Sequence, residues 1–291
     1  MDTVSIFGIP VAKVTEVEAI EWIVERAKGE GPREKGQGRR AKGEGPRAKG
    51  EVKSDGVMSD EGSKTSQTSQ TSQTDKAAFI ATLNVDFVSN AVSGWPFGGN
   101  DELWGYLKKA DFVTADGMPI VALSKLLRNP IPERVTGADM VPMICRRFAE
   151  EGLSIYILGQ SGGMRSENLS GVKVAGIDES FVKLDEEQPE IIERINAAKP
   201  DLLFVALGNP KQEIWMGRNA AKLRVPAMIG VGGTFNFIAG KVKRAPRWMQ
   251  KSGTEWIYRI LQEPGRLWKR YAYGLVKFSW LSLRAVMGGY K

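Results

Sequence analysis

Apolar and polar residues alternate along the chain with two different spacings. Short apolar runs that end at Gly, Asn, Asp or Pro predict buried β-strands, and apolar positions that recur every three or four residues predict amphipathic helices. The predicted strands are two short ones within 4–12, followed by 79–83, 112–115, 154–158, 172–177, 201–207 and 227–231. The predicted helices are one that ends near residue 27, followed by 85–92, 102–110, 118–128, 138–151, 187–199 and 210–222.

This alternation predicts an α/β fold with a mostly parallel, Rossmann-like sheet and helices on both faces. Right-handed crossovers then place the carboxyl ends of the strands along one edge of the sheet. The polar turns that fall at this edge are residues 82–84, 116–117, 159–163, 208–212 and 230–234. Open α/β sheets bind their ligands there, so the turns predict a glycine-lined cleft that carries Asn, Gln, Thr, Lys and Asp.

Composition divides the chain into four segments. Residues 1–27 hold the first strands and helix, and residues 77–240 hold the rest of the α/β core. Between them, residues 28–76 repeat AKGEGPR and TSQ and contain almost no large apolar residues, which predicts a disordered low-complexity insertion. For its basic half, 28–53, we favour a solvated linker over contact with nucleic acid or lipid. Residues 241–291 form a basic, aromatic tail that we predict to be an amphipathic helical appendage.

The amino-acid composition limits the possible chemistry. The chain has no histidine and a single cysteine, Cys145, which excludes Ser-His-Asp catalysis, Cys-His catalysis and an internal disulfide. General-base catalysis then requires a carboxylate, a lysine or a tyrosine. No run of about 18 apolar residues and no signal-peptide pattern is present, so we expect a cytoplasmic protein without a transmembrane helix.

Asp116 is the first candidate for chemistry. It follows the strand-like run 112–115 and precedes a Gly-Met-Pro turn and an apolar-periodic segment. An aspartate at the carboxyl end of a strand lies where α/β sheets bind ligands. Asp is also a favoured helix N-cap residue, and position alone leaves both interpretations open.

Two glycine-rich turns resemble nucleotide-binding loops only weakly. The sequence GVGGTF, at 230–235, has Phe235 in place of the third glycine of a dinucleotide fingerprint, and GQSGGM, at 159–164, lacks the Lys-Ser/Thr of a P-loop. Neither supports an NAD enzyme or an NTPase. The sequence GNPKQEIW, at 208–215, is more unusual, because a structural turn gives no reason for Gln212 to face the cleft.

The tail carries the positive charge of the protein. From residue 241 to 291 it has twelve Lys and Arg against two acids, a net charge of +10, whereas the other 240 residues sum to −3. Within 266–287, apolar residues recur at helical spacing with basic residues elsewhere, as in a helix at an anionic membrane surface. A platform for single-stranded nucleic acid and a helix packed on the core are the alternatives.

Six motifs in order along the chain resemble the signatures of the WecG/TagA/CpsF glycosyltransferases. They are TLNVDFV (82–88), TADGMP (114–119), RVTGAD (134–139), GNPKQEIW (208–215), GVGGTFNFIAG (230–240) and RAPRWMQKSGTEWIYRILQEPGRLWKRY (244–271). The resemblance runs from about residue 4 to 283, apart from the insertion. It implies an N-acetylmannosaminyltransferase-like enzyme.

By this resemblance, we expect an inverting, metal-independent enzyme that needs no cofactor. It would move an N-acetylmannosamine-type or related sugar from a UDP donor to an undecaprenyl-diphosphate-linked saccharide, for cell-envelope polysaccharide or teichoic-acid synthesis. The tail, 241–291, would hold the protein on the anionic inner face of the plasma membrane. We expect no nucleic-acid partner, and an oligomer is possible.

The resemblance also implies roles for individual residues. Asp116 would be the general base, with Thr82 beside it in the donor pocket and Gln212 near the transferring sugar. The other residues expected to bind substrate are Asn84, Arg134, Gly208, Asn209, Lys211, Gly232, Gly233, Arg259, Arg266, Lys269 and Arg270. With no histidine and no Asp-x-Asp cluster near the turns, arginines are the available means of neutralising a departing diphosphate.

Two functions of other classes remain open at this stage. A basic RNA- or single-strand-binding module would explain the tail but not the cleft. A catalytically weakened envelope-assembly scaffold would explain the segment 159–171, which is shorter than the glycine turn and helix usual in the family that the chain resembles.

Overall fold

The computed structural model describes residues 1–29 and 76–288, without the side chains of Lys251 and Arg266. The predicted insertion, 28–76, therefore lies almost entirely outside the described residues, and its predicted disorder stays a prediction.

The chain begins with a small antiparallel hairpin and a capped helix. Strands β1 (Thr3–Ile6) and β2 (Ile9–Ala12) pair with each other. Helix α1 (Glu16–Ala27) begins with a capping box, in which Thr15 and Glu18 satisfy each other's backbone N–H groups. The two short strands and the helix that ends at Ala27 confirm the sequence prediction.

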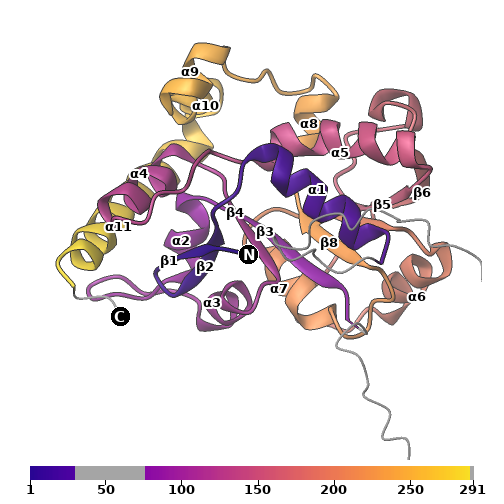
Figure 1. Cartoon of the computed structure of the whole chain (residues 1–291), viewed down its shortest axis with the longest axis horizontal. Coiled ribbons are helices and arrows are strands. Elements are labelled where there is room, and N and C mark those ends of the chain that lie inside the picture. Colours follow the sequence, from indigo (N-terminus) through magenta and orange to yellow (C-terminus); the bar gives the residue numbers. More distant parts are fainter. Residues whose placement is uncertain (30–75, 289–291) are drawn as a thin grey trace, which may run out of the picture.

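Six parallel strands form the central sheet, in the order β4-β3-β8-β7-β5-β6 (Figure 1). Their bounds are β3 (Ala78–Leu83), β4 (Phe112–Ala115), β5 (Ser154–Gly159), β6 (Lys173–Asp178), β7 (Leu202–Ala206) and β8 (Ala227–Gly230). Each predicted strand is present within one or two residues of its predicted ends. The sequence of apolar runs therefore predicted the sheet correctly.

Helices cover both faces of this sheet. Alternate residues of β3 show this directly, because Phe79 and Leu83 belong to one buried apolar cluster and Ile80 belongs to the other. The helices between the strands and after β8 are α2 (Val85–Ala91), α3 (Asp101–Lys108), α4 (Met118–Leu126), α5 (Gly137–Glu151), α6 (Pro189–Ala198), α7 (Lys211–Asn219) and α8 (Thr234–Ile238). The predicted α/β fold is confirmed.

The connection from β5 to β6 is reduced, as the short segment 159–171 indicated. Only a 3₁₀ turn, η1 (Ser166–Leu169), lies between these strands. Strand β6 is at the edge of the sheet. The short connection to it therefore does not uncover the central strands of the sheet.

The tail forms three helices, α9 (Arg247–Ser252), α10 (Glu255–Gln262) and α11 (Pro264–Val286). Helix α11 runs beside α2 at the end of the molecule opposite β6 (Figure 1). Its residues Leu267, Phe278 and Leu281 are buried, and the ring of Phe278 meets that of Phe7 edge-on. One face of the predicted appendage is therefore packed on the core. Among the described helices, none is both long enough and apolar enough to cross a bilayer.

Candidate active site

A pocket of about 630 Å³ lies along the edge where the strands of the large sheet end. This is a usual size for a small-ligand site. Turns after β3, β4, β5, β7 and β8 line it together with residues of α9, α10 and α11. The predicted site residues that line it are Thr82, Asn84, Asp116, Arg134, Gly208, Asn209, Gln212, Gly232, Gly233, Arg259 and Arg270. The core turns and the tail thus form one site.

Asp116 is held by the sheet and does not cap the next helix. Its backbone N–H donates to the carbonyl oxygen of Leu83 at 2.8 Å, which extends the pairing of β3 with β4. The N-cap of α4 is Gly117, and no side chain bonds to that helix end. The capping interpretation of Asp116 is therefore wrong, and its carboxyl group is available to the pocket.

The surroundings of Asp116 make its carboxyl a weak acid. Desolvation in the pocket raises its pKa from 3.8 to about 7, against the opposing effect of the nearby guanidinium groups of Arg134 and Arg259. The carboxylates of Glu255 and Asp139 add to the increase. A carboxyl with a pKa near neutrality can accept a proton and release it again at physiological pH.

Four charged residues join the tail to the core beside Asp116. In the core, Arg134 lies 3.6 Å from Asp139 and 3.5 Å from Glu255 of α10. In the tail, Arg244 lies 2.6 Å from Asp139, and its Nε atom is 4.0 Å from Glu255. That buried Nε has no hydrogen-bond partner. Both arginines and Glu255 line the pocket, so the network brings guanidinium groups from two distant parts of the chain to it, paired with carboxylates.

Gln212 is buried and connects two glycine turns. Its Oε1 atom accepts hydrogen bonds from the backbone N–H groups of Gly208 (3.1 Å) and Gly232 (3.0 Å). Its Nε2 atom donates to Glu213 at 2.6 Å. The side chain therefore fixes the turn after β7 relative to the turn after β8, and both turns line the pocket.

Glu213 in turn fixes the orientation of the Gln212 amide. It is fully buried, and its second oxygen accepts a hydrogen bond of 2.9 Å from Asn209. Desolvation raises the pKa of Glu213 to about 7, against the effect of the bonds from Gln212 and Asn209. A side chain added at Gly230 would approach both Gln212 and Glu213 within 3.0 Å, so only glycine fits there.

Two other predicted residues that line the pocket also have partners within the protein. Asn84 caps α2, where its Oδ1 accepts from the N–H groups of Asp86 (3.0 Å) and Phe87 (3.2 Å). Arg270 of α11 forms an ion pair of 2.6 Å with Asp86. These contacts join the start of α2 to the tail.

Two predicted site residues whose side chains are described, Lys211 and Lys269, are not brought into the pocket. The Nζ atom of Lys211 lies 4.4 Å from the ring centre of Phe181, and that of Lys269 lies 5.8 Å from the ring centre of Trp268. Neither lysine lines the pocket. The side chain of Arg266 is outside the described part of the chain. Substrate contacts of these three residues stay predictions.

Residues 57–291 match the family described as "Glycosyl transferase WecG/TagA/CpsF family". This match covers most of the chain. The chain belongs to the WecG/TagA/CpsF family. It is therefore a glycosyltransferase, as its motifs indicated.

A curated relative of this glycosyltransferase comes from Bacillus spizizenii (strain ATCC 23059 / NRRL B-14472 / W23). It is named N-acetylglucosaminyldiphosphoundecaprenol N-acetyl-beta-D-mannosaminyltransferase. The two proteins are 30% identical over 203 residues, which is 67% of this chain and 75% of the relative.

Sequence reasoning assigned no role to three residues of this WecG/TagA/CpsF protein that belong to the site. Arg244 lies within the motif that begins RAPRW, Glu255 is one of two acids in a basic tail, and Glu213 follows Gln212. For Glu255, the one signal in the sequence was a rare acidic residue in a tail with twelve Lys and Arg. In the described residues, no cluster of three or more acidic or cysteine side chains could hold a metal ion.

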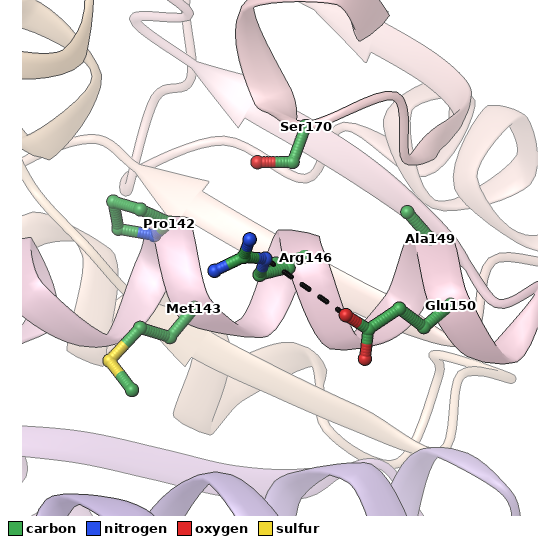
Figure 2. Close-up of a pocket in the computed structure, with 6 residues that line it drawn as sticks. All are labelled: Pro142, Met143, Arg146, Ala149, Glu150 and Ser170. Carbon is green, nitrogen blue, oxygen red and sulfur yellow. Dashed lines mark ion pairs between the residues drawn. The ribbon is translucent and has the colours of Figure 1, made fainter.

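A second hollow lies on the outer side of α5 (Figure 2). Its charged residues, Arg146 and Glu150, form an ion pair of 3.9 Å with each other. It contains none of the predicted site residues and lies away from the strand ends. The strand-end pocket is therefore the candidate active site.

Proposed function

We propose that this protein is an inverting, metal-independent glycosyltransferase that uses a UDP-sugar. The donated sugar is of the N-acetylmannosamine type, and the acceptor is a saccharide linked to undecaprenyl diphosphate. The product would serve cell-envelope polysaccharide or teichoic-acid synthesis. The name of the Bacillus spizizenii relative supports the sugar and the acceptor.

The observation that carries this proposal is that Asp116, Arg134 and Arg259 line one strand-end pocket, near enough for both arginines to lower the pKa of the carboxyl. A carboxyl with a pKa of about 7 suits a general base. Arginines beside it suit a diphosphate leaving group, because the guanidinium group donates two parallel hydrogen bonds to phosphate oxygens. One pocket thus holds a base and the means to stabilise a leaving group.

In the proposed reaction, the Asp116 carboxylate removes the proton from the acceptor hydroxyl. The acceptor oxygen attacks the anomeric carbon of the donor sugar from the face opposite the diphosphate. The bond from the anomeric carbon to the diphosphate oxygen breaks, and UDP leaves with the bonding electrons. A single displacement of this kind inverts the anomeric centre.

Arg134, Arg244 and Arg259 would stabilise the charge that develops on the diphosphate. Pre-oriented cationic donors can do this without a metal ion. Their common place in the pocket lining supports such a role.

We assign Gln212 a positioning role in this reaction. Both polar ends of its amide are bonded within the protein, to Gly208, Gly232 and Glu213. It therefore acts on the substrate through the shape of the two glycine turns. Thr82, which is buried beside Gly137 at the start of α5, completes the wall near Asp116.

The tail, 241–291, would hold the protein on an anionic membrane surface, at the inner face of the plasma membrane where a lipid-linked acceptor is anchored. The twelve cations of the tail support this.

The test is turnover with UDP-N-acetylmannosamine and a short-chain lipid-diphosphate-GlcNAc acceptor. Wild type should release UDP, also in the presence of a metal chelator, and kcat/KM should rise with pH up to about 7 and then level off. Asp116→Asn should lose about 10²- to 10⁴-fold in kcat. Asp111→Asn, at a carboxylate outside the pocket lining, is the matched control. Full turnover by Asp116→Asn would eliminate Asp116 as the base.

A further inference from the structure

Helix α11 exposes a second apolar face, distinct from the face that packs on the core. We call this face the outer stripe. Its residues recur every three or four positions, and more than a third of the surface of each is exposed. They are Tyr273, Val276, Trp280, Leu283 and Met287.

A core loop continues the outer stripe. This loop, 93–99, connects α2 to α3, and its residue Trp95 is 81% exposed, the most of any large apolar side chain described. The indole N–H of Trp280 donates to the carbonyl oxygen of Trp95 at 2.8 Å. The ring of Phe97 meets that of Tyr273 edge-on, with ring centres 5.8 Å apart. The loop and the stripe therefore form one continuous surface.

Buried contacts fix the loop to the helix. Lys277 is completely buried, and its ammonium donates to the carbonyl oxygens of Ser89 and Gly98. Because Gly98 belongs to the loop and Ser89 to α2, one side chain holds the loop, α2 and α11 together. The surface is a prebuilt part of the fold.

The chemistry of this surface fits a lipid bilayer better than a protein partner. Helix α11 has no acidic residue in its 23 residues. Of its five Lys and Arg, Lys277 is buried and Arg270 pairs with Asp86. The side chains of Lys269 and Arg284 are at least partly exposed. Tryptophan and tyrosine favour the region between lipid headgroups and acyl chains, because their rings are apolar and their N–H or O–H groups are polar. An anionic headgroup layer complements the cations, and the acyl chains complement Val276, Leu283 and Met287.

The pocket and the outer stripe share one helix. The residues of α11 that line the pocket are Leu267, Arg270, Tyr271 and Leu275. Val276, which belongs to the outer stripe, directly follows Leu275 in the sequence. A lipid-linked acceptor could therefore place its diphosphate in the pocket while its hydrocarbon chain stays in the membrane. This orientation is consistent with the proposed function.

We propose that loop 93–99 and the outer stripe of α11 together contact the membrane, with Trp95 inserted at the lipid interface. The core thus supplies part of the membrane-binding surface, in addition to the tail. This inference rests on the proposed use of a lipid-linked acceptor.

A single-cysteine label tests the position of the loop. The natural Cys145 is buried, and burial raises the pKa of its thiol to about 12, so a thiol reagent should react at an introduced surface cysteine. Full-length Trp95→Cys and Val276→Cys proteins carry a polarity-sensitive fluorophore and are mixed with phosphatidylglycerol/phosphatidylcholine vesicles. Phe181→Cys, at a 75% exposed aromatic beside β6, is the control. We expect a blue shift, and quenching by spin-labelled lipid, at 95 and 276 but not at 181.

A binding measurement complements the label. Trp95→Ser should bind these vesicles about tenfold more weakly than wild type, and Phe181→Ser should bind within about twofold of it. Turnover of a water-soluble acceptor should be unchanged in Trp95→Ser, so a failure of the proposed function would appear separately, as absent turnover by wild type.

Three outcomes would overturn the inference. A blue shift at position 276 without one at position 95 would show that loop 93–99 is not part of the membrane-binding surface. Vesicle binding with no shift at either position would place the membrane contact elsewhere. A shift that follows protein concentration without vesicles, accompanied by a larger mass in light scattering, would assign the surface to a second copy of the chain.

Discussion

The ammonium group of Lys277 in α11 donates a hydrogen bond of 2.5 Å to the carbonyl oxygen of Ser89 in α2. Lys277 is completely buried, and this burial lowers the pKa of its ammonium group. The contact therefore places a residue of the tail inside the folded core. Helix α11 of the tail is thus packed as part of the folded core, although Lys277 and Ser89 are 188 positions apart in the sequence.

Replacement of Lys277 by methionine should destabilise the protein. The variant keeps the apolar stem but leaves the carbonyl oxygens of Ser89 and Gly98 without their donor, at a cost of roughly 2–4 kcal/mol. Urea unfolding measures the change, with the exposed Lys269→Met as a control expected to stay within about 0.5 kcal/mol of wild type. An unchanged unfolding midpoint for Lys277→Met would show that α11 does not depend on this contact.

Asp116→Asn should be more stable than wild type above neutral pH. The pKa of this carboxyl is raised from 3.8 to about 7 in the folded protein, so the folded state binds a proton more tightly than the unfolded state does. The free energy of unfolding therefore falls as pH rises from about 4 to about 7, by up to about 4 kcal/mol. Asparagine does not titrate, so the difference between the two proteins should be largest at pH 8 and vanish near pH 4. Equal unfolding free energies at pH 8 would contradict the raised pKa.

An exchange of Gln212 and Glu213 tests the hydrogen-bond arrangement that they share. In Glu213→Gln, the new amide N–H₂ group faces one of the two donors, Asn209 or Gln212. In Gln212→Glu, two carboxyl groups face each other. Each single variant should be less stable than wild type and have a lower kcat/KM. In the double variant every donor has an acceptor again, because the glutamine at 213 donates a hydrogen bond to the glutamate at 212. We expect a coupling energy of about 1–3 kcal/mol in urea unfolding. Additive effects would show that the two side chains act independently.

Arg244→Lys should lose activity although it keeps the charge. A lysine cannot contact Asp139 and a phosphate oxygen with separate, fixed N–H groups as a guanidinium does, and we expect kcat/KM for the UDP-sugar to fall about 10- to 100-fold. Arg247→Lys, at an exposed position outside the pocket lining, is the control. Full activity of Arg244→Lys would mean that a point charge is sufficient.

The sequence predicted the elements of the fold well, because each depends on local patterns. The apolar runs of β3 to β8 and the capping box at Thr15 can each be recognised from a short stretch of sequence. The position of Asp116 at a strand end was also predictable, since parallel strands end at one edge of the sheet.

Side-chain directions and distant pairs were not predictable in the same way. Lys211 and Gln212 are adjacent on one helix, where successive residues point about 100° apart, so one faces Phe181 and the other faces the turn after β8. The pair of Arg134 with Glu255 joins residues 121 positions apart, and no local pattern indicates it.

The arginines near Asp116 couple its proton affinity to the charge held in the pocket. Arg134 and Arg259 lower the proton affinity of Asp116, and a bound diphosphate would draw on the same positive charge. When the proposed donor occupies the pocket, its negative charges would offset those arginines and raise the pKa of the carboxyl further. More of Asp116 would then be protonated at neutral pH, so kcat should reach its plateau at a higher pH than kcat/KM does.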